Sequence, residues 1–306
     1  MPITSFPGGS NYGWFQVASP GGPQFGVVSQ LHLARPTIAA QLNQMFANGQ
    51  RRLRIPLLFW RGRTPNGGTL DLVGGQFAPQ EWQNLADLLA LIKASGFEWV
   101  ELGFFPEGPG DALHNWTAWD EAAFQAHWNL VANVRQLAVA SGLPFFLDLM
   151  NEGIPDGSGG QALFGELSKR LWINYTASFW PGQTCQDASI SLDPDPARIA
   201  QMDATFSGNW PAVLEAHIYG AAAAPGWGSA YSTFVGIHQC LAGTPGAGLP
   251  WMINECFYND RVTAIELARG MQDTGQPVLC RIQYPMTPGQ DNVIPLDDSN
   301  YRVEGL

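Results

Sequence analysis

Two glutamates in this chain have the residue type and placement that acid–base or nucleophilic chemistry needs. Glu152 follows Asn151 after the apolar run "FFLDLM", and Glu255 follows Asn254 within "WMINECFY". One glutamate after an apolar strand is ordinarily only a solvated loop edge. Two carboxylates that meet at one centre can flank a glycosidic bond. One then protonates the leaving oxygen, and the other attacks the anomeric carbon or activates water.

The elements that must position these side chains alternate between strand-like and helical patterns from about residue 24 to residue 285. The predicted strands are 24–31, 51–60, 98–105, 143–150, 184–193, 210–220, 249–258 and 276–285. The predicted helices are 36–49, 78–96, 120–141, 161–180, 195–206, 229–243 and 261–275. This alternation is typical of parallel βαβ units.

Eight strands in a chain of 306 residues favour a closed barrel over an open sheet. We therefore predict an α/β fold, a (β/α)8 TIM barrel. It would form a single catalytic domain over residues 1–306, with a core at about 24–285 and an irregular tail at 286–306.

In such a barrel, chemistry is located at the carboxyl ends of the strands. Glu152 and Glu255 end the predicted fourth and seventh strands, which lie nearly opposite each other across the barrel mouth. Glu101 and Asp148 fall inside strands instead, so we expect them to be buried and paired rather than catalytic.

Four short motifs resemble those of the clan A glycoside hydrolases, the retaining (β/α)8 enzymes that include families 5 and 39. They are "LRIP" at 53–56, "NEG" at 151–153, "HIY" at 217–219 and "INEC" at 253–256. The resemblance implies that Glu152 is the general acid/base and that Glu255 is the nucleophile.

The same resemblance assigns roles to neighbouring residues. It implies that Asn151 binds the sugar hydroxyl next to the reacting carbon. Arg54 and Tyr219 would hold the nucleophile ionised and oriented, and His217 would bind the sugar or orient a glutamate.

Aromatic and histidine side chains complete the predicted substrate site. Trp60, Trp116 and Trp227 lie in or near loops with Gly or Pro nearby, so their flat faces are candidate sugar platforms. Many members of the clan carry a histidine after strand three and a tryptophan after strand eight. His114 is the candidate for the first place here, and Tyr284 or Gln283 for the second.

Residue environment also suggests how the two glutamates differ. Glu152 follows an apolar strand, so partial desolvation should raise its pKa. Glu255 should be held as the anion by Arg54 and a tyrosine hydroxyl. The distance that separates retention from inversion cannot be obtained from sequence, so retention rests on the resemblance.

Other function classes find little support. The net charge of −11 opposes nucleic-acid binding, and no apolar run is long enough to span a membrane. The four cysteines lack CxxC spacing, and no dinucleotide, phosphate-loop or HExxH motif occurs, so no cofactor and no metal is expected. We expect a monomer. No signal peptide is visible; the protein would be extracellular or periplasmic if a signal had been removed, and cytoplasmic otherwise.

The leading hypothesis is a retaining glycoside hydrolase that cleaves a β-linked poly- or oligosaccharide, in an endo mode. One alternative is a non-catalytic carbohydrate-binding barrel. Another is a different TIM-barrel enzyme such as a metal-dependent hydrolase, which would need clustered His and Asp ligands at strand ends. Among the histidines only His217 is placed in that way.

Overall fold

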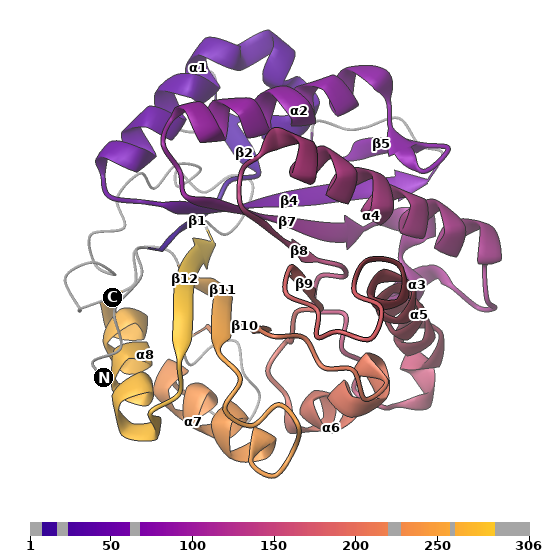
Figure 1. Ribbon diagram of the computed structural model, residues 1–306, viewed down its shortest axis with the longest axis vertical. Helices are drawn as coiled ribbons and strands as arrows, with labels where there is room; N and C mark the ends of the chain where they lie inside the picture. The colour runs from indigo at the N-terminus through magenta and orange to yellow at the C-terminus, as the bar shows by residue number, and fades with distance from the viewer. Residues whose placement is uncertain (1–7, 17–23, 62–67, 220–227, 258–260, 285–306) are drawn as a thin grey trace.

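The computed structural model describes residues 8–16, 24–61, 68–219, 228–257 and 261–284, and these form a parallel barrel (Figure 1). The barrel strands are β1 (Gly9–Asn11), β4 (Arg52–Arg61), β7 (Trp99–Pro106), β8 (Phe145–Asp148), β9 (Ala188–Ser189), β10 (Leu214–His217), β11 (Trp251–Phe257) and β12 (Val278–Tyr284). They pair in parallel in the order β10, β11, β12, β1, β4, β7, β8, β9. A parallel bridge between Leu192 and Ala216 joins the two ends of this order. The predicted (β/α)8 barrel is confirmed.

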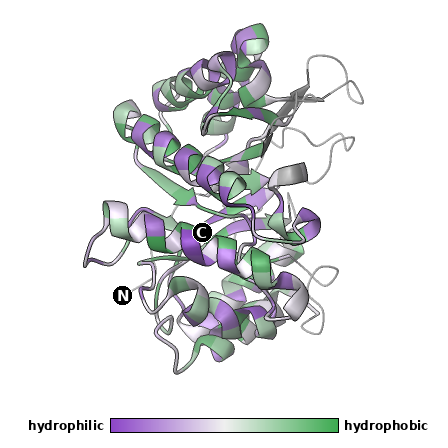
Figure 2. Ribbon diagram, turned by 90° about the vertical axis from the view of Figure 1, so that its right-hand side faces the viewer, coloured by the Kyte–Doolittle hydropathy of each residue, from purple (hydrophilic) through white to green (hydrophobic). Residues whose placement is uncertain are grey.

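Helices form the outer layer of the barrel. They are α1 (Val27–Ala47), α2 (Pro79–Ala94), α4 (Glu121–Ser141), α5 (Ala162–Phe179), α6 (Pro196–Phe206), α7 (Ala230–Leu241) and α8 (Arg261–Thr274). Each long helix carries hydrophobic and hydrophilic residues along its length (Figure 2). In α2, for example, Leu85, Leu88, Leu89 and Ile92 are fully buried at helical spacing.

Small elements complete the described chain. They are the antiparallel pair β2 (Trp14–Gln16) and β3 (Gln24–Gly26), the pair β5 (Leu70–Val73) and β6 (Gln76–Phe77), the short helix α3 (Ala112–Asn115), and the 3-10 turns η1 (Gly108–Gly110) and η2 (Gly159–Gln161). No helix among the described residues has the length and apolar character that crossing a bilayer requires.

The predicted first strand at 24–31 is wrong. Only Gln24–Gly26 is extended, and α1 begins at Val27. Val27, Leu31 and Ile38 are buried on one side of that helix, so the apolar run follows helical spacing. The chain kinks at Ala34, just before Pro36, because proline cannot continue the helical hydrogen bonding there. The helix predicted from Pro36 is therefore the second half of a longer, kinked helix.

The true first strand is the three-residue segment "GSN", which has no hydrophobic signature. Gly9 is required there because a Cβ atom would lie 1.5 Å from the backbone oxygen of Arg52 on β4. Polar side chains connect this strand to β11 and β12: Asn11 Nδ2 donates to the Asn254 carbonyl on β11, and Gln283 Nε2 on β12 donates to Ser10 Oγ. The strand is identified by close backbone approach and polar bridging rather than by apolar residues.

The barrel interior changes character from bottom to top. Near the amino ends of the strands, Phe146, Met252, Cys280 and Ile282 form a separate apolar cluster. Above it the interior becomes polar, with Arg54 fully buried on β4. The apolar lower cluster closes the barrel floor, and the polar upper part contains the groups described below.

Replacing Gly9 with alanine should destabilise the protein by about 1–3 kcal/mol, because the added Cβ overlaps the Arg52 backbone. Thermal and urea denaturation measure the change. Gly159→Ala is the matched control, since a Cβ there meets no atom within 4 Å. Equal stability of the two variants would show that residues 9–11 do not form a barrel strand.

Candidate active site

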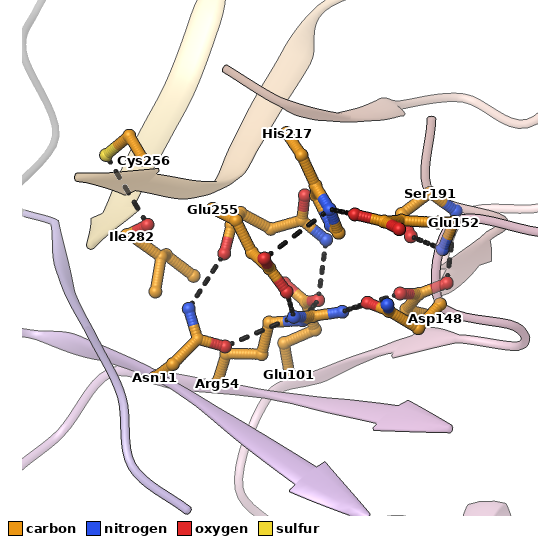
Figure 3. Close-up of polar contacts among 12 residues, drawn as sticks. Asn11, Arg54, Glu101, Asp148, Glu152, Ser191, His217, Glu255, Cys256 and Ile282 are labelled. Carbon is orange, nitrogen blue, oxygen red and sulfur yellow. Dashed lines mark hydrogen bonds and ion pairs between the residues drawn. The ribbon is translucent and has the colours of Figure 1, made fainter. Parts of the chain in front are cut away.

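Glu255 lies at the upper end of β11, where Figure 3 shows its contacts with Arg54 and His217, and it accepts hydrogen bonds from two donors. Arg54 Nη1 donates to its Oε1 over 2.5 Å, and the Tyr219 hydroxyl donates to its Oε2 over 2.5 Å. Glu255 is only 5% exposed. Burial, and then the negative charge of Glu255, raise the pKa of Tyr219 well above its usual value, so the phenol stays a donor. Arg54 pairs the charge of the carboxylate, and the two donors together fix the orientation of the carboxylate group.

Glu152 lies just after β8 in an unusual backbone conformation. Its φ angle is +50°, in the left-handed region that side chains other than glycine rarely adopt. Its backbone N–H donates to Ser191 Oγ over 2.7 Å, which helps to hold this turn. The following residue must be glycine, because a Cβ on Gly153 would lie 2.6 Å from the Ile190 side chain. The turn directs the Glu152 carboxyl group toward the barrel mouth, where its side chain is 42% exposed.

A second irregularity occurs on β11. The register between β11 and β12 shifts between Ile253 and Cys256, and this bulge contains both Asn254 and Glu255. Asn254 Nδ2 donates to Glu101 Oε1 inside the barrel, while Glu255 meets Arg54. Consecutive strand residues normally point to opposite faces, so the bulge allows both side chains to point inward.

His217 links the two glutamates. Its Nδ1 lies 2.9 Å from Glu152 Oε1 and 3.5 Å from Glu255 Oε2, and the ring is fully buried. One oxygen of each glutamate and a ring nitrogen lie within 4.8 Å of one another. The two carboxyl groups therefore share one small centre at the barrel mouth.

The pKa shift of Glu152 is opposite in direction to the expected one. Burial raises the pKa of Glu152, but the hydrogen bond from His217 and its charge outweigh burial, so the net shift is downward. Burial lowers the pKa of His217, yet the charge of Glu255 and the hydrogen bond to Glu152 raise it overall. The prediction of a raised Glu152 pKa is therefore wrong for the unliganded protein. The sequence indicated the apolar strand but not the His217 ring that contacts the carboxylate.

Arg54 connects the site to buried acids on neighbouring strands. Its Nε donates to Glu101 Oε1 over 2.5 Å, and its Nη2 donates to Asp148 Oδ2 over 2.7 Å. The expectation that Glu101 and Asp148 are buried and paired is confirmed. Nη2 also donates to Asn151 Oδ1 over 2.8 Å, which leaves the amide NH2 group of Asn151 as its donor for a substrate hydroxyl.

The structure thus brings together Arg54, Asn151, Glu152, His217, Tyr219 and Glu255. Tyr284 ends β12 close by, and burial together with the charge of Glu255 raises its pKa to about 12.

The other candidates lie elsewhere or outside the described residues. Trp116 is half-buried and packs edge-on against Trp119, with ring centroids 5.4 Å apart. His114 is not brought to the cluster: its side chain is 71% exposed on α3 and pairs with Asp111. The Trp60 side chain and the whole of Trp227 lie outside the described residues.

Two residues that support the site, Asn11 and Ser191, were not predicted from the sequence. Asn11 Oδ1 accepts from Arg54 over 3.2 Å, and Ser191 supports the Glu152 turn. Asn11 lies in a segment with no strand pattern. Ser191 could have been found, because Ser189 and Ser191 flank Ile190 in the alternation of a half-polar strand.

Two sets of side chains place possible metal-ligand atoms within 4.8 Å of one another: Glu152, His217 and Glu255, and Glu101, Asp148 and Glu215. Hydrogen bonds within the protein already occupy one member of each set, Glu255 in the first and Asp148 in the second. Both Glu255 oxygens already accept hydrogen bonds. Asp148 Oδ1 accepts from the backbone N–H of Ser191, and Asp148 Oδ2 accepts from Arg54. Arg54 already places a positive charge beside Asp148 and Glu255.

No family model matches the sequence, and no curated protein matches it. Solved structures do match the fold. A broad-specificity GH5-4 endoglucanase from Clostridium longisporum has a TM-score of 0.60 at 12% identity, with 99% of this chain and 95% of that chain covered. A β-mannanase from the blue mussel Mytilus edulis has a TM-score of 0.59 at 13% identity, covering 95% and 90%.

An exo-β-1,4-mannosidase from Opitutaceae bacterium strain TAV5 has a TM-score of 0.53 at 14% identity. The match covers 92% of this chain but only 56% of that one, so this chain spans little more than half the length of that enzyme. At these identities the comparisons establish the fold. The expected resemblance to clan A glycoside hydrolases is thus confirmed as a resemblance of fold alone.

Removing the imidazole of His217 should lower the stability of the folded protein in a defined pH window. The Glu152 contribution is present above its ordinary pKa of 4.5 and is lost as pH falls through its lowered pKa. The His217 contribution is present below its ordinary pKa of 6.5 and is lost as pH rises through its raised pKa.

The melting temperature of wild type should therefore exceed that of His217→Asn by most between pH 4.5 and 6.5. Thermal denaturation across a pH series measures this difference. His114→Asn, at an exposed site, should show no such maximum. A pH-independent difference for His217→Asn would contradict the ion pair.

Proposed function

We propose that this protein is a retaining glycoside hydrolase that cleaves a β-linked poly- or oligosaccharide. One observation carries the proposal. Glu255 is fixed by Arg54 and Tyr219, while an oxygen of the half-exposed Glu152 lies within 4.8 Å of a Glu255 oxygen. That arrangement supports a nucleophile and a proton donor flanking one glycosidic bond.

In the first step, a Glu255 oxygen attacks the anomeric carbon, and the bond to the leaving oxygen breaks. Glu152 supplies the proton to that oxygen. A bound sugar excludes water from Glu152, which disfavours its charged form and draws the proton shared with His217 toward the carboxyl group. The low pKa of Glu152 in the unliganded protein is therefore compatible with an acid role.

In the second step, Glu152 removes a proton from water, and the water oxygen displaces Glu255 from the sugar. His217 can accept the surplus proton through Nδ1, which lies 2.9 Å from Glu152 Oε1. Asn151 donates to the sugar hydroxyl beside the reacting carbon. No metal or organic cofactor takes part in these steps.

Similar folds guide the choice of substrate class. The matching structures include endoglucanases, β-mannanases and an exo-β-1,4-mannosidase. We propose β-linked glucans or mannans as the substrate class of this chain, and endo cleavage as the first mode to test. A carbohydrate-binding barrel without catalysis has no specific observation in its favour, because binding alone does not require a carboxylate fixed by two strong donors.

Replacing Glu152 with glutamine should lower kcat by about 10²–10⁴-fold on substrates with poor leaving groups, since a positioned proton donor contributes that much. Aryl glycosides with acidic leaving groups should lose much less, because they need no protonation. Glu255→Gln should remove turnover of both kinds of substrate.

Reducing-sugar release from β-glucans and β-mannans, and aryl glycoside hydrolysis, measure these effects. Glu81→Gln on α2 is the control, a buried glutamate outside the site that should keep wild-type activity. A 2-deoxy-2-fluoro glycoside should label Glu255. Labelling of another residue would overturn the assignment, and absence of both cleavage and labelling would overturn the function.

A further inference from the structure

A second group of acids lies inside the barrel, below the catalytic pair. Glu101 on β7, Asp148 on β8 and Glu215 on β10 are each at most 1% exposed, with one oxygen of each within 4.8 Å of the others. Asp148 is satisfied by Arg54 and backbone N–H groups. Glu101 Oε1 accepts from Arg54 and Asn254. These contacts account for only part of the group.

Three carboxyl oxygens remain without a conventional donor. Among the described residues, no nitrogen or hydroxyl donates to Glu101 Oε2 or to either oxygen of Glu215. Glu101 and Glu215 instead face each other, with one oxygen of each within 4.8 Å of the other. Two ionised carboxylates cannot occupy such a buried contact, because like charges at that separation disfavour a second ionisation. A hydrogen bond between them requires one proton.

The surrounding charges do not remove this requirement. The largest electrostatic influences on Glu215 come from Glu101, Asp148 and Arg54, and Glu215 also acts on the Cys280 thiol on β12. Burial raises the pKa of Cys280 to about 12, so the thiol is neutral. Arg54 is therefore the cation within this group, and it also pairs with Glu255 on the neighbouring β11.

We propose that Glu215 is held as a neutral carboxylic acid that donates its proton to Glu101, and that the pair acts as a positioning device for Arg54. Glu101 then presents one negative charge to Arg54 Nε and one acceptor to Asn254, the residue before the nucleophile. The chain of contacts runs from Glu215 through Glu101 to Arg54 and then to Glu255. Its catalytic consequence rests on the proposed function, whereas the protonation itself does not.

The electrostatics agree with the geometry. Burial, followed by the charges of Glu101 and Asp148, raises the pKa of Glu215 well above its usual value. Burial also raises the pKa of Glu101, to about 7, against the opposing effect of Arg54. Both shifts favour a pair that keeps one proton.

Infrared spectroscopy tests the protonation without a substrate. Near pH 8, wild type should show the carbonyl stretch of a neutral buried carboxylic acid, and Glu215→Gln should lack it. Glu81→Gln is the control and should keep the band. Burial raises the pKa of Glu81 to about 7, so its carboxyl group should be mostly ionised near pH 8. Absence of the band from wild type, or its persistence in Glu215→Gln, would overturn the proposal.

Kinetics test the positioning role. In Glu215→Gln the amide can donate to Glu101 as the acid does, so kcat should stay close to the wild-type value. Glu215→Leu has no donor, and displacement of Arg54 should lower kcat and the rate of Glu255 labelling by about a hundredfold with little change in KM.

Equal loss in both variants would show that Glu215 must be charged, which overturns the proposal. If Glu215→Leu does not fold, the glutamine variant and the infrared band still decide. Wild type that shows the band but cleaves no sugar would refute the proposed function and leave the protonated pair standing.

Discussion

The upper half of this barrel depends on one buried guanidinium. Arg54 is inaccessible to solvent, and its hydrogen bonds reach side chains on β1, β7, β8 and β11 and in the turn after β8. A buried charge is tolerated only when paired and hydrogen-bonded, so each acceptor around it is also a structural requirement. The planar fork of donors sets where Glu255, Asp148 and Asn151 can lie relative to one another.

This arrangement explains why polar residues occupy positions that a stability argument alone would leave apolar. The lower interior follows the usual rule and is closed by an apolar cluster. The upper interior holds more acidic side chains than cationic ones, and hydrogen bonds together with the proton shared by Glu101 and Glu215 stabilise them. Apolar replacements there would be compatible with a barrel but would leave Arg54 without its acceptors. The polar layer is therefore better explained by placement of reactive groups than by folding.

Much of the molecule was predictable because its signals are local. The strand–helix rhythm gave seven of the eight barrel strands, and the placement of Glu152 and Glu255 at strand ends brought both to one centre. The first strand was not predictable, because Gly9–Asn11 owes its place to backbone contact with β4 and β12. The sign of the Glu152 pKa shift was missed for the same kind of reason, since it depends on His217, 65 residues away in the sequence. Patterns along the chain indicate elements, whereas charges depend on neighbours that only folding brings close.

Each Asn–Glu pair occupies a local break in regular geometry: a left-handed turn at Glu152, and a bulge on β11 at Asn254 and Glu255. A regular strand would send one member of each pair outward. Transplanting this site into another barrel would therefore require copying backbone as well as side chains. A recipient strand with ideal alternation could have the same amino-acid sequence. It would still present either the amide or the carboxylate to the cavity, never both. The transferable unit is the distorted strand end with its supporting Ser191 and Gly153.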